Sequence, residues 1–541
     1  MSNYVQRNFL ELNNFKKKID TAVIVSNFTF VKKDQWILDN YTEENYERDV
    51  ILFGLKNVWD KITYYLLNYS TKNELFNSNN IACLYEKGLA IVNKEHKKNC
   101  GQYYTPFDVA TIMSKWLDSL QGENICDVAC GTGNLVLTYL DFIGKDRAIQ
   151  LLKGEKLYLY DNDGIALNIC ETLILLKYGM CFKDKIHIVK CDFLDANIKL
   201  PNDCKTISNP PYSVLKGGNV LYKSLYESYN SKELYAMFME KIITQSRSAV
   251  IITPYSFIGG DKFYSLRKLM NDYSGFIISF DNVPGNIFNG KKQGVFNSNT
   301  VNSVRAAITV LNNNYTKGFA LTPLIRFKNE ERERLLDTEI LEKYLNNISQ
   351  KVNVYNRKYL KCHDTLFGLF QKWQAISNKM IGDYISTSGE YLIAMPNTCR
   401  YYTTGSNSKL KRNGQIILNI SDKDVFNYLF CFINSSFTYW YWRIYDGGIT
   451  YPKNLLLRVP VFFDILTDRD KIFFEKIADE LIQNKTKFII KKNNKGMQEN
   501  IKFPRYYRDV INRRLLDIIG IKESEKIFDM VHSNTALEIS L

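Results

Sequence analysis

The chain has 541 residues, 45% of them hydrophobic and 24% charged, which is the composition of a folded soluble protein with roughly three domains. No apolar run approaches the length of a membrane span, and the N-terminus lacks the apolar core of a secretion signal, so we expect a cytoplasmic protein without a membrane partner. Eleven cysteines without a CxxC pair and four scattered histidines indicate neither a disulfide framework nor a metal site.

Positive charge is concentrated in the C-terminal part of the sequence. The formal net charge is +14, and residues 351–541 hold 29 Lys and Arg against 19 Asp and Glu, which supplies +10 of it. A basic bias confined to one part of a chain favours a polyanionic partner over a merely solvated surface. We therefore expect a nucleic-acid contact in this part.

The first elements in chain order are helical. Residues 1–96 carry apolar side chains at helical spacing and predict a helical N-terminal segment. Gly101-Gln102-Tyr103-Tyr104-Thr105-Pro106 follows, in which glycine and Thr-Pro predict a bend and the two tyrosines are suited to lie against a flat ligand. A helix is then expected over residues 107–120.

A short strand and a glycine loop come next. Ile125–Val128 predicts the strand, and Ala129-Cys130-Gly131-Thr132-Gly133-Asn134 predicts a loop that opens a helix. Gly131 and Gly133 permit positive φ angles and close approach of the backbone to a ligand, as at the first strand-to-helix turn of doubly wound folds. Asp127 lies at the strand end, where its carboxylate is able to face a cation. The loop lacks the GxGxxG and phosphate-loop patterns, so neither NAD nor ATP is favoured.

Two further apolar strands end in acidic residues. The first leads to Asp161 and Asn162, at a position suited to binding ribose hydroxyls. The second leads to Asp192, which is placed to accept from an adenine amino group, and to Phe193, which is placed to stack on the ring. Because the carboxyl ends of parallel strands share one edge, these residues predict a ligand crevice there.

The next strand delivers Asn209-Pro210-Pro211-Tyr212. Two consecutive prolines fix φ twice and remove two backbone donors, so Asn209 is presented on a rigid, extended spur. Its amide oxygen and the carbonyl of Pro210 are both able to accept hydrogen bonds from a planar amino group, and Tyr212 offers a flat face for stacking. The segment predicts a pocket for an exocyclic amino group, with an ordinary surface turn as the other interpretation.

The order of these segments resembles the S-adenosylmethionine-dependent N6-adenine DNA methyltransferases. The resemblance covers residues 97–312 and implies an α/β fold with a doubly wound, mostly parallel Rossmann-like methyltransferase sheet. It implies S-adenosylmethionine as the cofactor, double-stranded DNA as the partner and a flipped-out adenine as the substrate, with a cognate restriction endonuclease as a further partner. The residues that it implies for the cofactor are Tyr103, Tyr104, Thr105, Pro106, Asp127, Ala129, Cys130, Gly131, Gly133, Asn134, Asp161, Asn162, Asp192, Phe193 and Asn209.

The same resemblance assigns the reacting edge of the site. Asn209, Pro210, Pro211 and Tyr212 would receive the target base, and no general base is expected because the proton is able to leave after transfer. In the family an aromatic residue farther along the chain lies against the other face of the base. Phe288 is our assignment for it, and Phe296 is the second candidate.

The resemblance also divides the chain. We expect a methyltransferase domain over 97–312, a charged connector over 313–350 and a mixed α+β target-recognition domain over 351–541, in which the basic stretches 485–495 and 505–514 are predicted helices. Mixed basic and aromatic residues predict contacts with phosphates and bases. The DNA-binding residues that we expect are Lys291, Lys292, Lys409, Lys411, Arg412, Arg443 and Lys453.

Several alternatives stay open at this point. The same chemistry suits N4 of cytosine or an RNA base, and the Asn-Pro-Pro-Tyr motif also occurs in enzymes that methylate a protein glutamine amide at N5. A non-catalytic DNA-binding subunit that keeps the fold is an alternative from another class. The basic C-terminal part and the Gly-x-Tyr-Tyr-Thr-Pro segment before the glycine loop favour DNA.

Overall fold

The computed structural model describes residues 105–215, 220–288, 304–312, 318–337, 339–341, 354–355, 358–448, 450–493 and 497–533. The helical segment expected over 1–96 lies outside these residues, as do Tyr103, Tyr104, Lys291, Lys292 and Phe296. What the sequence predicts for them stays a prediction.

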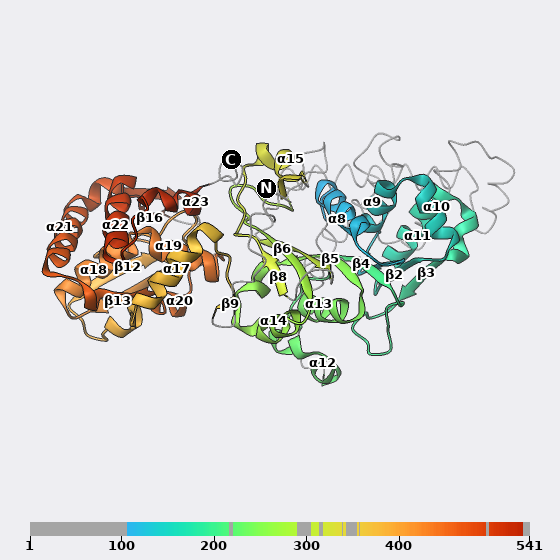
Figure 1. Cartoon of the computed structure of the whole chain (residues 1–541), viewed down its shortest axis with the longest axis horizontal. Coiled ribbons are helices and arrows are strands. Elements are labelled where there is room, and N and C mark those ends of the chain that lie inside the picture. Colours follow the sequence, from blue (N-terminus) through green and yellow to red (C-terminus); the bar gives the residue numbers. More distant parts are fainter. Residues whose placement is uncertain are drawn as a thin grey trace.

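An eight-stranded sheet organises the first half of the described chain (Figure 1), with the strand order β3-β2-β1-β4-β5-β7-β6-β8. Strand β7 runs antiparallel to both of its neighbours, β5 and β6, and all other pairs are parallel. The expected doubly wound, mostly parallel sheet is therefore confirmed. The strands are β1 (Asn124–Val128), β2 (Leu157–Asp161), β3 (Ile186–Lys190), β4 (Cys204–Ser208), β5 (Ser248–Pro254), β6 (Ser274–Phe280), β7 (Ala306–Asn312) and β8 (Gly318–Leu321).

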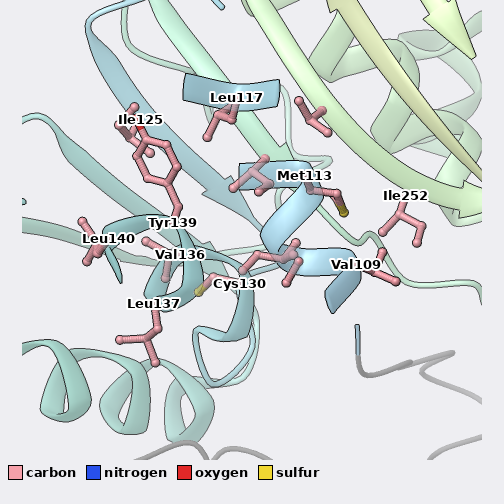
Figure 2. Close-up of a cluster of buried hydrophobic side chains, with 14 of the residues drawn as sticks. Val109, Met113, Leu117, Ile125, Cys130, Val136, Leu137, Tyr139, Leu140 and Ile252 are labelled. Carbon is pink, nitrogen blue, oxygen red and sulfur yellow. The ribbon is translucent and has the colours of Figure 1, made fainter. Parts of the chain in front are cut away.

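Helices cover both faces of the sheet, because its strands are apolar on both sides. On β1, Ile125 packs into the core of one face and Cys126 into the core of the other, which is the alternation expected of a strand. Figure 2 shows the first of these cores, where side chains of two helices meet next to Ile125. The first face carries α8 (Phe107–Ser119), α9 (Asn134–Ile143), α10 (Lys145–Lys153) and α11 (Gly164–Tyr178), and the second carries α13 (Leu234–Gln245) and α14 (Tyr264–Met270).

The strand order reverses at the junction of β1 and β4. Strands β2 and β3 lie on one side of this junction, whereas β4 and β5 lie on the other. Asp127 of β1 and Ile207 of β4 are register partners, so the glycine loop and the Asn-Pro-Pro-Tyr segment leave the sheet side by side. Ligands of open α/β sheets bind at such a reversal.

The domain boundary expected at residue 312 is wrong. Strand β8 lies beyond it and pairs in parallel with β6, and Phe319 of β8 is fully buried. Ile325 and Phe327 extend the core of the first face. The apolar stretch is short and is followed at once by the charged residues 328–334, which concealed it in the sequence. Most of the expected connector therefore belongs to the sheet domain.

The described residues from 360 to 533 form a second domain of mixed α+β structure, as expected (Figure 1). Its core is aromatic, with Trp373 packed against Phe432, Phe437 and Trp440 at ring-centroid distances of 5.0–6.2 Å. Among the helices of the described residues, none combines the length and the apolar character that a membrane crossing requires. The main elements are α17 (Asp364–Ile376), β12 (Tyr391–Pro396), β13 (Gln415–Ile420), α18 (Lys423–Ile433), α19 (Ser436–Tyr445), α20 (Lys453–Leu457), α21 (Asp468–Asn484), β15 (Ile489–Asn493), β16 (Met497–Ile501) and α22 (Arg505–Ile518).

One of the two basic helices expected near the end of the chain is wrong. Instead of a helix over 485–495 the structure has a 3₁₀ turn followed by β15, in which Ile489 pairs with Ile501 of β16. The β-branched residues Ile489 and Ile490 favour a strand over a helix. The helix expected over 505–514 is confirmed by α22.

A buried ion cluster joins the two domains. Asp281 follows β6 and is 1% exposed. Burial raises the pKa of its carboxyl, but three guanidinium groups outweigh this and hold the pKa well below its usual range. The carboxylate accepts hydrogen bonds at 2.6–3.0 Å from Arg305, Arg326 and Arg443.

The DNA contact expected for Arg443 is therefore wrong. The side chain is 6% exposed and lies on α19, where it faces Asp281 across the domain junction. A buried arginine needs an opposite charge, and Asp281 supplies it from a position 162 residues away in the sequence.

Asp281→Asn should destabilise the protein by about 3–5 kcal/mol, because it leaves three buried guanidinium groups without their counter-charge. The ionised carboxylate stabilises the fold fully above its unfolded pKa of 3.8, and this contribution is lost as the pH falls toward the lower pKa of the folded state. The difference in free energy of unfolding between wild type and variant, measured with denaturant, should therefore become smaller below about pH 4.

The matched control is Asp203→Asn, which breaks a solvent-exposed ion pair with Arg247. It should change unfolding very little, since exposed pairs contribute little. Equal losses in the two variants would contradict the role assigned to Asp281.

Candidate active site

The glycine loop after β1 is bent by three residues with positive φ, which is 77° at Ala129, 55° at Gly131 and 90° at Gly133. A side chain at Gly133 is excluded by contact as well, because its Cβ would lie 2.4 Å from the sulfur of Cys170 on α11. The loop is therefore a cradle of bare backbone, which is the form that admits close approach of a ligand.

Asp161 at the end of β2 holds this loop in place. Its Oδ2 accepts from the backbone N–H of Gly131 and its Oδ1 from that of Asp163, each at 2.8 Å. The side chain is largely buried, and burial raises the pKa of its carboxyl. Asn162 beside it is exposed. The structure thus gives Asp161 a positioning role, and its contact with a ribose stays a prediction.

Asp127 is a buried carboxylate without an ion-pair partner among the described residues. It is 0% exposed, and its contact with the backbone N–H of Val136 offsets only part of the cost of burial. Burial, together with the nearby charge of Asp161, raises its pKa well above the usual range. A positively charged ligand group beside Asp127 would stabilise its ionised form against burial and against the charge of Asp161. The residue therefore suits the cationic part of a ligand.

Thr105 connects the cradle to the Asn-Pro-Pro-Tyr segment. Its backbone carbonyl accepts from the side-chain amide of Asn134 at 2.7 Å, at the start of α9. Its hydroxyl accepts from Nδ2 of Asn209 at 2.9 Å. Thr105 is 2% exposed, and Pro106 next to it caps α8. The structure therefore brings together three segments that the sequence placed in one site.

The two aromatic residues assigned to the target base lie against each other. The rings of Tyr212 and Phe288 have centroids 6.1 Å apart and planes inclined by 66°. The hydroxyl of Tyr212 donates to the carbonyl of Ile252 at 3.2 Å, which fixes this ring to β5. Two parallel rings need a gap of about 7 Å to hold a base between them, so Phe288 must turn before both rings stack on one base. Pro210 is buried and Pro211 half-buried behind them.

The loop after β3 is held by a lysine that the sequence did not single out. Lys241 on α13 donates to the carbonyls of Phe193 and Asp195 at 2.6 and 2.7 Å and lies 4.7 Å from the centre of the Phe193 ring. Burial lowers its pKa to about 8. A lysine within an apolar helix carries no sequence signal for this contact, because its partners are backbone atoms.

Phe193 and Asp192 differ in their exposure. Phe193 is 3% exposed and packs against Tyr160 and Phe238, so its ring is enclosed by the protein. Asp192 is exposed and accepts from the N–H of Leu194 and from the hydroxyl of Tyr222. Stacking by Phe193 and binding of an amino group by Asp192 stay predictions.

The basic residues predicted for DNA binding separate into two groups. Lys409, Lys411 and Lys453 are exposed on the second domain. Arg412 is half-buried, where it donates to Thr398 Oγ1 at 2.7 Å and to Asn500. Arg412 is therefore committed to holding its own loop, and the three lysines are the candidates that solvent reaches.

The fold and the strand-end residues together define a doubly wound α/β protein with a ligand site at the β1–β4 reversal. Residues 77–358, just over half of the sequence, match the family described as N-6 DNA Methylase, and the chain belongs to this family.

Individual relatives are distant. The chain is 23% identical over 246 residues to the type I restriction enzyme EcoEI methylase subunit of Escherichia coli, a match over 43% of this chain and 48% of that protein. It is 27% identical over 197 residues to the type II methyltransferase M.PstI of Providencia stuartii, over 32% of this chain and 37% of that protein. The chain thus spans about half, or less, of the length of these relatives. A solved DrdV–DNA complex aligns with a TM-score of 0.46 at 12% identity, covering 89% of this chain and 72% of that one.

Gly133→Ala should destabilise the protein more than Gly520→Ala does. Both glycines have φ values of 69–90°, so alanine at either costs about 1–2 kcal/mol of backbone strain. At Gly133 the new Cβ would also meet the Cys170 sulfur, whereas nothing lies within 4 Å at Gly520. Denaturant unfolding measures the difference.

The double variant Gly133→Ala/Cys170→Ala removes the sulfur and should recover the excess loss. Equal destabilisation by the two single glycine variants would show that the cradle is looser than its geometry implies.

Proposed function

We propose that this chain transfers a methyl group from S-adenosylmethionine to the N6 amino group of an adenine flipped out of double-stranded DNA. The observation that carries the proposal is the pair of hydrogen bonds at Thr105, which join the helix after the glycine loop to Asn209. A site that binds a donor in the cradle and an acceptor at Asn209 would hold both reactants in one crevice. Membership of the N-6 DNA methylase family supports this choice.

The cradle suits the cofactor in charge and in the path of its backbone. Asp127 offers a buried carboxylate without an ion-pair partner among the described residues to a positive group, and the positive φ angles at Ala129, Gly131 and Gly133 bend the loop after β1. When bound, S-adenosylmethionine supplies a methyl group already activated on a sulfonium. Asp161 and Asp192 would accept from its ribose and adenine groups.

The residues after β4 act on the amino group that is methylated. Thr105 accepts from Nδ2 of Asn209, and this fixes the amide with its oxygen as the acceptor for the substrate. The carbonyl of Pro210 follows on a backbone that two prolines make rigid. The lone pair of an adenine amino group is delocalised into the ring, and two fixed acceptors favour a more tetrahedral nitrogen. No general base is needed, because the proton leaves after transfer.

A stacked base does not reach this site, so the target must leave the duplex. Tyr212 is held by Ile252 and would stack on one face of the base, and Phe288 would turn to take the other face. The second domain would select the target sequence through contacts with base edges. The relative from Escherichia coli is named as the methylase subunit of a restriction enzyme, and we propose a restriction endonuclease as a partner of this chain as well.

Asn209→Ala should lose methyl transfer by about a hundredfold or more and lower cofactor affinity far less, because the acceptor for the amino group is gone while the rest of the cradle is kept. Calorimetry with S-adenosylmethionine and transfer of labelled methyl to DNA measure the two properties separately. Asn197→Ala, which changes an exposed amide in the same domain, is the control. Unchanged turnover in Asn209→Ala would show that Asn209 is not the acceptor for the amino group.

Lys409→Glu/Lys411→Glu should weaken DNA binding and lower the slope of log affinity against log salt by about two, one for each lost phosphate contact. Cofactor affinity should stay the same. The control is Lys145→Glu/Lys153→Glu on α10, an equal charge change at the far end of the sheet domain (Figure 1). Equal losses of affinity in both double variants would mean that net charge, rather than this surface, governs binding.

A further inference from the structure

Arg332 lies where three parts of the sheet domain meet. It is the first residue of α15 (Arg332–Leu335) and is 3% exposed. Its Nε and Nη2 donate to the two carboxylate oxygens of Asp108 at 2.6 and 2.9 Å. Its Nη1 donates to the carbonyl of Asn286 at 2.8 Å, and Nη2 donates also to that of Ile287 at 2.7 Å. One buried guanidinium thus makes four hydrogen bonds to two separate segments.

Both segments belong to the candidate active site. Asp108 lies in the first turn of α8, three residues after Thr105, which binds Asn209. Asn286 and Ile287 directly precede Phe288, whose N–H donates to Oδ1 of Asn286 at 2.9 Å. Arg332 therefore connects the segment that orients Asn209 with the segment that carries Phe288.

These contacts close a ring around the site. Asn209 is bonded to Thr105, Arg332 links the start of α8 to the residues before Phe288, and Phe288 contacts Tyr212, three residues after Asn209. Of these links, the one through Arg332 joins Asp108 to the 286–288 segment by hydrogen bonds. Without it the ring opens, and the contact of Phe288 with Tyr212 is the link of the ring that still ties Phe288 to the Asn209 segment.

We propose that Arg332 is a positioning residue for methyl transfer, which acts through Phe288 by fixing the backbone that carries this ring relative to the segment that binds Asn209. The proposal rests on the function proposed above. An arginine is needed because its planar fork binds both carboxylate oxygens and still has donors for two carbonyls, whereas a lysine ammonium is a single point charge. Small misplacements of a group that holds the substrate cost up to about a hundredfold in rate.

Arg332→Lys in the full chain tests this. Two duplexes carry the mapped target site. Turnover is measured on the duplex with the target adenine and should fall by about ten- to a hundredfold. The second duplex has 2-aminopurine in place of the flipped base and serves for fluorescence alone, because 2-aminopurine lacks the 6-amino group that is methylated. Affinity for the cofactor should be unchanged, and the fluorescence of the bound duplex should differ from that of wild type. The control is Arg267→Lys, a 2%-exposed arginine that donates to the carbonyls of Phe257 and Gly260 away from this ring.

If Arg332 had a purely structural role, both lysine variants would lower the unfolding midpoint, and the folded fraction of each would have the turnover and the fluorescence of wild type. The inference predicts changes in turnover and fluorescence for Arg332→Lys alone. In a Phe288→Ala background, Arg332→Lys should then have no further effect on turnover, because the group through which it acts is gone.

The inference would be overturned if the fold-losses of turnover from Arg332→Lys and Phe288→Ala multiplied in the double variant. Wild-type turnover in Arg332→Lys would overturn it as well. In either case an active wild-type chain would leave the proposed function standing. A wild-type chain that transfers no methyl group to DNA would overturn the proposed function, and the inference with it.

Discussion

The reversal of strand order between β1 and β4 is the constraint on which the site depends. Because these two strands are hydrogen-bonded neighbours whose following chains diverge, the glycine loop and the Asn-Pro-Pro-Tyr segment leave the same edge in adjacent positions. Thr105 then uses this proximity, since it reaches Asn134 with its carbonyl and Asn209 with its hydroxyl. The helix after the glycine loop and the Asn-Pro-Pro-Tyr segment are thereby fixed to one another by two hydrogen bonds of a single buried residue.

Buried ion pairs attach the second domain to the sheet at the edge that carries Asn209. Asp281 follows β6 and Arg305 precedes β7, so both lie at the edge that carries Asn209, and Arg443 of α19 meets them there. The hydroxyl of Tyr255, which follows β5, donates to the carbonyl of Asp446 after α19 at 2.6 Å and adds a second tie. The domain proposed to choose the DNA sequence is thus anchored beside the site proposed to modify it.

Much of this arrangement could be predicted because it is local. Each sheet strand through β5 is a short, mainly apolar run that ends in, or is followed within three residues by, glycine, an acid or proline, and this pattern indicated the strands and their ends. The run of aromatic residues in α19 also indicated that this helix is buried. What failed depends on distant partners. Arg443 looked solvent-exposed because its carboxylate lies 162 residues away, and β8 was concealed by the charged residues after it. Arg332 belongs to that charged run, and nothing in its neighbours indicates that it binds Asp108.

Methyl transfer by the wild-type chain tests whether Asn209 and the cradle form one site for methylating an adenine amino group. The chain is incubated with labelled S-adenosylmethionine and plasmid DNA, and the DNA is digested to nucleosides that are then separated. Label is expected in N6-methyldeoxyadenosine, and sequencing of the modified positions should place it at a defined sequence. Label in N4-methyldeoxycytidine would show that the target base is cytosine, and cofactor binding without labelled DNA would show that the site does not methylate DNA.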